Sequence, residues 1–299
     1  MMLVSLMLPL VLLILAGALA RHWLQIEAKP LARLTLYLLS PALIFNSLYQ
    51  SRLTGPQLTQ LAAGTLLLII ILSWVLAFFC RLLRCPIHLA SALQLGAVFM
   101  NVGNYSLPIV AAACGSGGLE RGAVIMVVHQ MLMFTLAVFF AARGTMGARA
   151  AIGKVVQMPT AYAAVSALTL RSLALPLPQW LTQSISLLCQ ASIPIFLLLL
   201  GIQLADMLFS QRWLLLSMGT CFKLGFAPIM ANFLARLLHF DSLSQQVFVL
   251  AAASPTAVVT TMLAVEFDAE PELVSSLTLV TTLFSLFSIP LIMRLLGLG

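Results

Sequence analysis

Ten long apolar segments constrain this chain more than any other feature of its sequence. Each has about the length that a helix needs to cross a hydrocarbon core of roughly 30 Å. Lipid cannot satisfy exposed backbone groups, so the segments must be helical, and the alternating pattern of a membrane β-barrel is absent. We predict an all-α integral membrane protein of about ten transmembrane helices. The segments are residues 3–20, 31–50, 57–80, 90–114, 121–142, 157–175, 181–205, 213–235, 244–265 and 273–296.

Composition excludes an ordinary soluble fold, because 62% of the 299 residues are apolar and only 8% are charged. Soluble domains carry about 25% charged residues. The first segment has the length and the small-residue end of a signal peptide, but no Lys or Arg precedes its apolar run. We therefore expect it to be the first transmembrane helix.

The positive charges of the chain predict its orientation. The net charge of +7 is spread over short loops, which indicates topology rather than nucleic-acid binding. The loops after the first, third, fifth and seventh segments hold nine Lys or Arg against five on the other side, so we expect both termini on the non-cytoplasmic side. The nine are Arg21, Lys29, Arg33, Arg81, Arg84, Arg143, Arg149, Lys154 and Arg212, and the five are Arg52, Arg121, Arg171, Arg236 and Arg294.

The chain divides into two halves of similar design. Residues 1–143 are predicted to form a first five-helix repeat, 144–156 a short central cytoplasmic loop, and 157–299 a second five-helix repeat. Because five is an odd number of crossings, the second repeat would be inverted relative to the first. Inverted repeats are typical of secondary transporters.

Prolines support this division. Pro41 in the second segment is followed 67 residues later by Pro108 in the fourth, and Pro194 in the seventh is followed 61 residues later by Pro255 in the ninth. The matched spacing favours a repeat over an unrelated scatter of prolines, although proline is common in membrane helices.

The fourth segment carries the strongest functional pattern, FMNVGNYSLP at residues 99–108. Asn101 and Asn104 are expensive in the middle of a membrane, Gly103 loosens the backbone, and Pro108 removes a helical hydrogen bond. We expect a helix broken near the midplane, with its second half beginning near residues 107–108. The N-terminus of a half-helix is a ready site for a carboxylate.

Ser254, Pro255 and Thr256 repeat this device in the ninth segment. If the two broken helices cross, four half-helix ends converge on one point. We therefore predict that both interruptions bind the substrate.

Two further polar residues lie inside apolar segments. Lys223 costs about 2.5–3.5 kcal/mol in the middle of a span, which favours a role as an anion counter-charge or as a fixed cation, with a structural bond as the alternative. His129 is a candidate proton relay, or else a hydrogen bond between helices.

Several of these motifs resemble the auxin efflux carrier family, which lies within the superfamily of bile-acid and sodium symporters. Residues 101–108 and the turn at Gly115 resemble its broken fourth helix, residues 254–276 its ninth and tenth helices, and residues 40–45 its second helix. The resemblance covers most of the chain, and its motifs combine order, spacing and residue type.

The resemblance implies two inverted five-helix repeats, a scaffold bundle, and a transport bundle in which helices four and nine cross. It also implies a small organic anion as substrate, such as auxin in plants or malate and malonate in bacteria. The short central loop is similar to that of bacterial members, so the expected location is a bacterial inner membrane. Plant members commonly carry a lysine in the ninth helix, where this chain has Val265.

The leading hypothesis is thus a secondary carrier that works by alternating access. A sodium-coupled symporter of the bile-acid type stays open as one alternative, and an intramembrane enzyme or non-transporting membrane subunit as another. No nucleotide-binding loop, metal motif or nucleophile elbow occurs in the sequence, so we expect no enzyme activity, cofactor or metal. Coupling to protons and assembly as a homodimer remain open.

Overall fold

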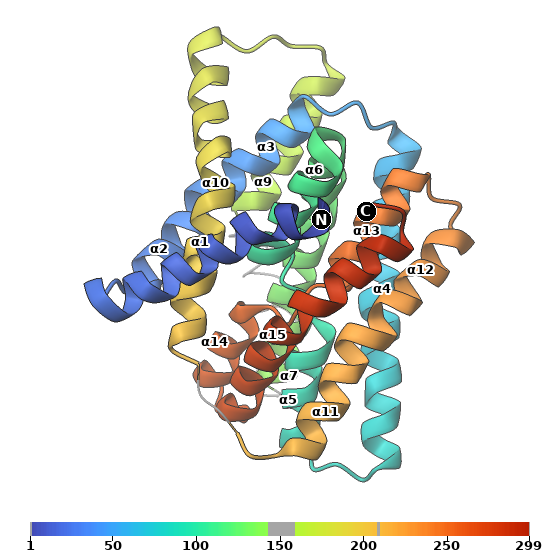
Figure 1. The fold of residues 1–299 in the computed structure, drawn as a ribbon. Helices are drawn as coiled ribbons and strands as arrows, with labels where there is room; N and C mark the ends of the chain where they lie inside the picture. The colour runs from blue at the N-terminus through green and yellow to red at the C-terminus, as the bar shows by residue number, and fades with distance from the viewer. Residues whose placement is uncertain (1, 143–158, 208–209, 299) are drawn as a thin grey trace.

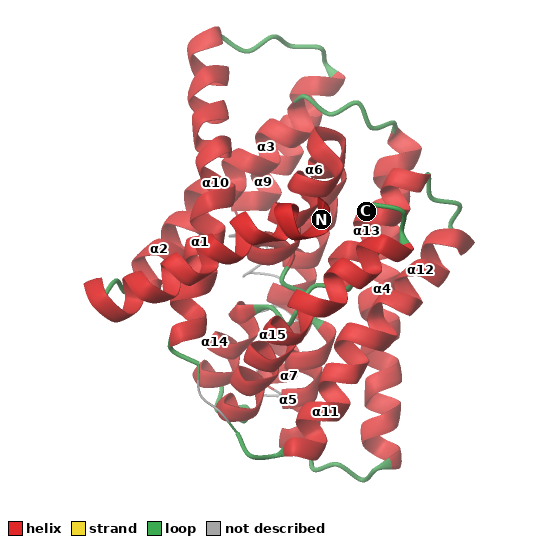
Figure 2. Ribbon diagram, in the orientation of Figure 1, coloured by secondary structure: helices red, strands yellow, loops and turns green. Residues whose placement is uncertain are grey.

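A computed structural model describes residues 2–142, 159–207 and 210–298 of the chain. Its regular elements are all helical within these ranges, as Figure 2 shows, and this confirms the predicted fold class. The predicted central loop at 144–156 lies outside the described residues, and so do Arg143, Arg149 and Lys154.

The first half of the chain follows the predicted segments closely. Its second segment is one continuous run of three elements, and its fourth and fifth segments share a long helix that turns sharply inside. The elements are α1 (Met2–Leu24), α2 (Ala28–Leu34), η1 (Thr35–Leu39), α3 (Ser40–Tyr49), α4 (Gly55–Leu82), α5 (Ile87–Val98), η2 (Val102–Ser106), α6 (Leu107–Leu132), η3 (Met133–Ala137) and α7 (Val138–Ala142), where η marks a π-helical turn.

The second half is built in the same way, with a π-helical turn in its eighth segment and an interruption in its ninth. The elements are α9 (Pro159–Ser172), α10 (Gln179–Ala205), α11 (Trp213–Cys221), η4 (Phe222–Phe226), α12 (Ala227–Leu237), α13 (Ser242–Ala252), α14 (Val258–Glu266) and α15 (Pro271–Leu295). Whether the halves are inverted repeats stays a prediction.

Six helices in the described ranges are long and apolar enough to cross a membrane unaided. This is fewer than ten partly because interruptions divide the fourth and ninth segments, so that α5 and α13 appear as shorter apolar helices. The first and sixth segments contribute only the shorter stretches Leu8–Leu24, within α1, and α9 to the described residues. The fourth and fifth segments are merged in one run, since α6 bends back at Gly115, where φ is 62° and ψ is −155°.

Contacts between the described loops place them on two faces of the molecule, as a chain that crosses it repeatedly requires. Arg21 Nε, after the first segment, pairs with Asp206, after the seventh, at 2.8 Å. Glu270, after the ninth, pairs with Arg212 at 3.2 Å and with His88, after the third, at 3.5 Å. These odd-numbered loops therefore share one face of the molecule, which runs from the turn between α1 and α2 at the left of Figure 1 to the loops at the bottom.

The even-numbered loops share the opposite face, at the top of Figure 1. The Tyr49 hydroxyl donates to the Leu175 carbonyl at 3.0 Å, which joins the second and sixth loops. The Gln57 amide donates to Asp241 Oδ2 at 3.1 Å, which joins the second and eighth. Which of the two faces is cytoplasmic stays a prediction.

The helices pack as two bundles. The smaller bundle consists of α1, α2–α3, α9 and α10, on the left of Figure 1, and the larger one of α4, α5 and α11–α15. The long helix α6 packs on α4 and α13 of the larger bundle and also contacts α3 of the smaller. In the smaller bundle, α1 and α10 touch backbone to backbone, since a Cβ on Gly201 would lie 1.9 Å from the Ile14 carbonyl oxygen.

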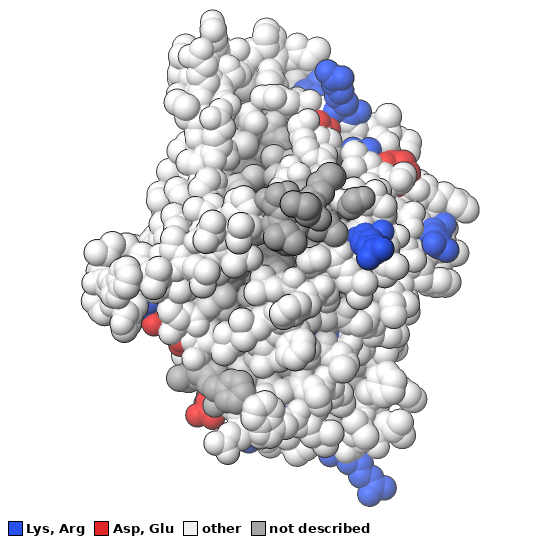
Figure 3. All heavy atoms as spheres, in the orientation of Figure 1, with Lys and Arg blue, Asp and Glu red and all other residues white. Residues whose placement is uncertain are grey.

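Large apolar side chains cover the outside of both bundles. Trp74, Leu214 and Phe287 are 77%, 81% and 79% exposed. Figure 3 shows that charged side chains on this view gather toward the edges and leave most of the face uncharged. Such a surface is suited to lipid rather than water.

Candidate functional site

The predicted break in the fourth segment is present, but it lies earlier than expected. Helix α5 ends at Val98, Phe99 is extended with φ −83° and ψ 133°, and the helical run resumes at Val102. The predicted start of the second half-helix near residues 107–108 was therefore wrong. Asn101, Gly103 and Asn104 lie at the new N-terminus rather than before it.

Pro108 shapes the helix without breaking it. It follows the π-helical turn η2, and the N–H of Leu107 donates to the carbonyl of Val102, five residues back. In an ordinary α-helical turn the proline ring would clash with a carbonyl, and its missing N–H would leave one hydrogen bond unformed. A wider turn makes room for the ring. Pro41 and Pro228 stand at the same offset from η1 and η4.

The ninth segment is interrupted between α13, which ends at Ala252, and α14, which begins at Val258. Its buried residues Ser254, Pro255 and Thr256 cross the first interruption. Met100 and Thr256 form an antiparallel bridge. The Asn101 N–H donates to the Pro255 carbonyl at 2.9 Å, and the Ala257 N–H donates to the Phe99 carbonyl at 3.2 Å.

Side chains satisfy the other backbone groups of this crossing. The Met100 N–H donates to His129 Nε2 at 3.0 Å, and the Thr256 N–H donates to Thr281 Oγ1 at 3.1 Å. The Thr256 hydroxyl in turn donates to the Gly96 carbonyl. Irregular backbone is tolerated inside a membrane only when it is satisfied by protein in this way or faces a watery cavity.

A cavity of about 350 Å³ lies beside the crossing, between the two bundles. Of the predicted site residues, Asn101, Gly103, Asn104 and His129 line it. The cavity is not lined by Ser254, Pro255 or Thr256, which form the crossing itself. It is not lined by Pro108 either, which lies at the start of α6.

Four polar side-chain atoms of the cavity residues are buried without a hydrogen-bond partner in the described part of the chain. They are Asn101 Nδ2, Gln130 Oε1, Gln203 Oε1 and Thr35 Oγ1. Buried polar atoms are nearly always paired, so an unpaired set in one cavity calls for a ligand or water. The first N–H groups of the half-helix that starts at Val102 also have no intrahelical partner.

Charge around the cavity has one sign. Lys29 and Arg33 are exposed and line its mouth at α2, on the face of the odd-numbered loops. The lining contains no Asp or Glu among the residues that the structure describes. Four methionines contribute to the wall and provide a soft surface that adapts to apolar groups of varied shape; they are Met100, Met126, Met133 and Met262.

The sequence reasoning missed the cavity roles of Thr35, Lys29 and Arg33. Thr35 could have been found from its place in a π-helical turn that Pro41 predicts, because such turns often mark functional sites. The two cations were interpreted only as topology signals. Nothing in the linear sequence places the start of the second segment beside the fourth.

Lys223 and His129 occupy different surroundings from those expected. Lys223 in η4 is fully buried, and its Nζ has no hydrogen-bond partner among the described residues, but it does not line the cavity. His129 is buried, and its Nε2 accepts the Met100 N–H, so the proton of the neutral ring lies on Nδ1.

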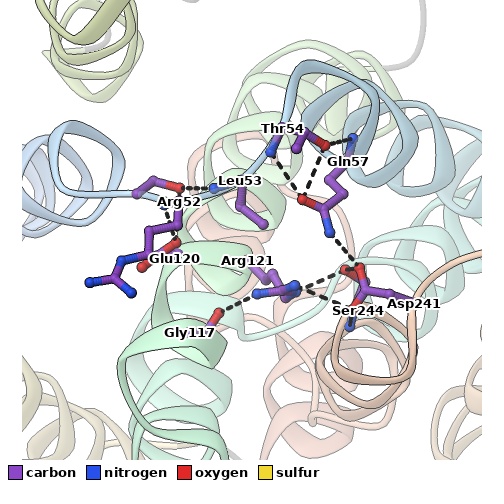
Figure 4. A network of polar contacts seen from close by, with 10 residues as sticks. Arg52, Leu53, Thr54, Gln57, Gly117, Glu120, Arg121, Asp241 and Ser244 are labelled. Carbon is purple, nitrogen blue, oxygen red and sulfur yellow. Dashed lines mark hydrogen bonds and ion pairs between the residues drawn. The ribbon is translucent and has the colours of Figure 1, made fainter. Parts of the chain in front are cut away.

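A second group of polar residues lies on the face of the even-numbered loops (Figure 4). Arg121 donates to the Gly117 carbonyl at 3.0 Å and to Ser244 Oγ at 2.9 Å, and it pairs with Asp241 Oδ1 at 3.2 Å. Burial raises the pKa of Asp241, but hydrogen bonds from Ser244 and Gln57 and the charge of Arg121 outweigh it and leave the pKa below its usual value. This cluster fastens α4, α6 and α13 to one another.

Two interrupted helices that cross beside a cavity, in an all-α membrane protein, form an arrangement that is typical of membrane transporters. The comparison with known proteins agrees: residues 2–293 match the family described as Membrane transport protein, and the chain belongs to this family of auxin efflux carrier type. The predicted resemblance is therefore confirmed. The chain is also 28% identical over 267 residues, 89% of its length and 88% of the relative's, to a protein of Methanothermobacter thermautotrophicus named "Uncharacterized transporter".

Proposed function

We propose that this transporter is a secondary carrier for a small organic anion, which binds in the cavity beside the crossing. The observation that carries the proposal is the pairing of two cations at the mouth, Lys29 and Arg33, with unpartnered polar atoms at the inner end. An anion entering this cavity gains favourable charge at both ends, since the half-helix N-terminus is also positive.

Each part of the cavity has a distinct part in binding. The Asn101 amide and the N–H groups at residues 102–104 donate to a carboxylate oxygen. Gln130, Gln203 and Thr35 supply acceptors and donors for other polar groups of the substrate. The methionine walls contact its carbon skeleton, which favours an organic anion over an inorganic one.

The two-bundle architecture supports the proposal of alternating access. The crossing belongs to the larger bundle, whereas Thr35 and Gln203 belong to the smaller one. A movement of one bundle against the other would carry Asn101 away from Thr35 and Gln203 and open the site to the opposite face. Lys223 lies buried in the larger bundle, and its Nζ has no hydrogen-bond partner among the described residues. It is therefore a candidate for a fixed positive charge in that bundle.

Uptake into proteoliposomes tests the proposal. Labelled mono- and dicarboxylates are offered with and without a pH gradient, and with sodium replaced by potassium. Asn101→Ala should reduce saturable uptake by about tenfold or more, because a charge-assisted hydrogen bond contributes about 1.5–3 kcal/mol. Asn232→Ala is the matched control, since Asn232 bonds Gln245 at 2.7 Å and does not line the cavity.

The outcomes separate the parts of the proposal. Saturable uptake of amino acids or sugars, but not of carboxylates, would overturn the anion assignment. Full uptake by a folded Asn101→Ala protein would overturn the site. Uptake that disappears without sodium would favour the symporter alternative over a proton-linked or uncoupled carrier.

A further inference from the structure

A second cavity, of about 580 Å³, opens on the face of the even-numbered loops. It lies between the loop at residues 50–54, which joins the two bundles, and the turn of α6 at Gly115. Arg52, Glu120 and Arg121 line it, together with Ser116 and Gly117. The first cavity is lined by residues of the crossing and by Lys29 and Arg33 on the other face, whereas the lining of the second contains no residue of the crossing.

Glu120 of α6 connects with this loop in a specific way. Its Oε2 accepts the Ser51 hydroxyl and the Arg52 N–H, both at 2.9 Å. The Ser51 oxygen also accepts the Leu53 N–H at 3.1 Å, and this bond within the loop constrains its backbone conformation. Figure 4 shows Glu120 directed at the loop and away from the Arg121 cluster.

The same loop is fastened to the smaller bundle. Arg171, at the end of α9, donates to the Leu53 carbonyl, and the Tyr49 hydroxyl receives the Leu177 N–H at 3.3 Å. These bonds hold the loop against α9 and the segment that follows it, and the loop continues from Thr54 into α4. Glu120, on the helix that packs with the larger bundle, ties that bundle to the loop through two hydrogen bonds to one charged oxygen.

Asp241 offers an instructive contrast on the same face. Its partners Arg121, Ser244 and Gln57 come from α6, α13 and α4, which all pack together in the larger bundle. Breaking the Asp241 contacts would loosen one bundle but would not release it from the other. Glu120 differs because its contacts bridge the boundary along which the bundles would slide.

We propose that Glu120 is a positioning residue for the alternation step: it holds the larger bundle against residues 51–52 and so keeps the second cavity separate from the crossing while the first cavity reaches it. This inference rests on the carrier function proposed above. A partly buried, charge-assisted pair of hydrogen bonds is sufficient to shift a two-state equilibrium by about tenfold. Loss of Glu120 should therefore favour the state open to the even-loop face.

The test is cysteine accessibility, which needs no substrate. Cys114 is half-buried next to Gly115 and beside the lining of the second cavity, and Met262 lines the first cavity and is 43% exposed. In a Met262→Cys background, a water-soluble maleimide is applied to the protein in detergent, where both faces are accessible, and mass spectrometry reads both positions. Glu120→Ala should raise labelling at Cys114 and lower it at position 262, each by about threefold to tenfold.

Two matched variants make the result specific. Glu120→Gln keeps one acceptor oxygen without the charge, so its labelling should lie between wild type and Glu120→Ala. Asp241→Asn should lower the melting temperature in detergent and leave the labelling ratio unchanged. Monodispersity on gel filtration establishes that each variant is folded.

Unchanged labelling at both positions in folded Glu120→Ala would overturn the proposal, as would a rise at both positions, which indicates general loosening. Because no uptake is measured, a wrong substrate assignment leaves this result unaffected. Conversely, opposite shifts at the two positions would support the gate even if the carboxylates tested were not transported.

Discussion

At the scale of residues, the polar groups of the two interruptions divide into those that hold the crossing and those that face the cavity. The N–H and the hydroxyl of Thr256 both donate hydrogen bonds to protein partners. The Asn101 N–H bonds Pro255, while its side-chain amide nitrogen has no partner within the described chain and lines the cavity. One residue thus joins the two functions, which makes its substitution the most informative.

His129 is expected to act by holding the Met100 peptide. His129→Leu leaves that buried N–H without an acceptor, which costs about 1–3 kcal/mol, so both the melting temperature and the apparent substrate affinity should fall. His129→Gln supplies an acceptor oxygen and should restore much of both. Thermal unfolding in detergent and uptake kinetics in proteoliposomes check these outcomes.

The pH profile of uptake separates this positioning role from a proton relay. A glutamine cannot titrate, so retention of the wild-type pH profile in His129→Gln fits a structural acceptor. Loss of proton-gradient dependence with intact stability would instead assign proton transfer to His129.

At the scale of elements, proline sets the local shape of three helices without ending them. In η1, η2 and η4 the residue before the proline bonds the carbonyl five residues back. Each widened turn changes the direction of the side chains beyond it relative to a regular α-helix. The turns contain polar residues, among them Thr35, Asn104, Ser106 and Lys223.

Gly115 determines where α6 turns back on itself. Its φ of 62° and ψ of −155° lie in a region that is essentially restricted to glycine, and no neighbouring atom would obstruct a Cβ. Gly115→Ala should therefore destabilise the protein by about 1–3 kcal/mol through backbone strain alone. Gly225→Ala is the control, because its site is equally open and its φ is ordinary.

Thermal unfolding in detergent measures this difference. The melting temperature should fall for Gly115→Ala and stay level for Gly225→Ala. Equal melting temperatures for the two variants would show that the turn tolerates a side chain and that its strain is relieved elsewhere.

At the scale of the whole molecule, the cavities on the two faces differ in the charged residues that line them. Lys29 and Arg33 lie at the mouth of the first cavity, where no carboxylate among the described residues joins them. The second cavity is lined by charges of both signs, Arg52, Glu120 and an Arg121 that is bound by Asp241 and Ser244. A pair of exposed cations raises the local concentration of an anion, and salt screens the effect over about 10 Å at 0.1 M.

The double variant Lys29→Gln/Arg33→Gln should raise the apparent KM for an anionic substrate by about threefold to tenfold at low ionic strength. The difference should shrink as salt is added, because screening already removes the attraction in wild type. Initial uptake rates at several salt concentrations measure both effects. Arg236→Gln, exposed on the other face and lining neither cavity, should leave the KM unchanged at every salt concentration.

The apolar segments by themselves determined the class of fold, because a chain with so few charges can satisfy its backbone in lipid only as helices. The asparagines and prolines also marked both interruptions, since each residue type disfavours a continuous buried helix for a local reason. The N-terminus of the second half-helix was misplaced, because whether Pro108 breaks a helix or widens it depends on its packing.

Only the tertiary structure decided which polar residues share the cavity. Asn101 and Thr35 are 66 residues apart in the sequence, and Gln203 is further still, so no local rule brings their unpartnered atoms together. The packing of α3 and α10 against η2 and α6 does so. The same packing leaves Ser254, Pro255 and Thr256 behind the cavity wall, where their polar groups bond protein, because a buried donor takes the nearest acceptor that the fold supplies.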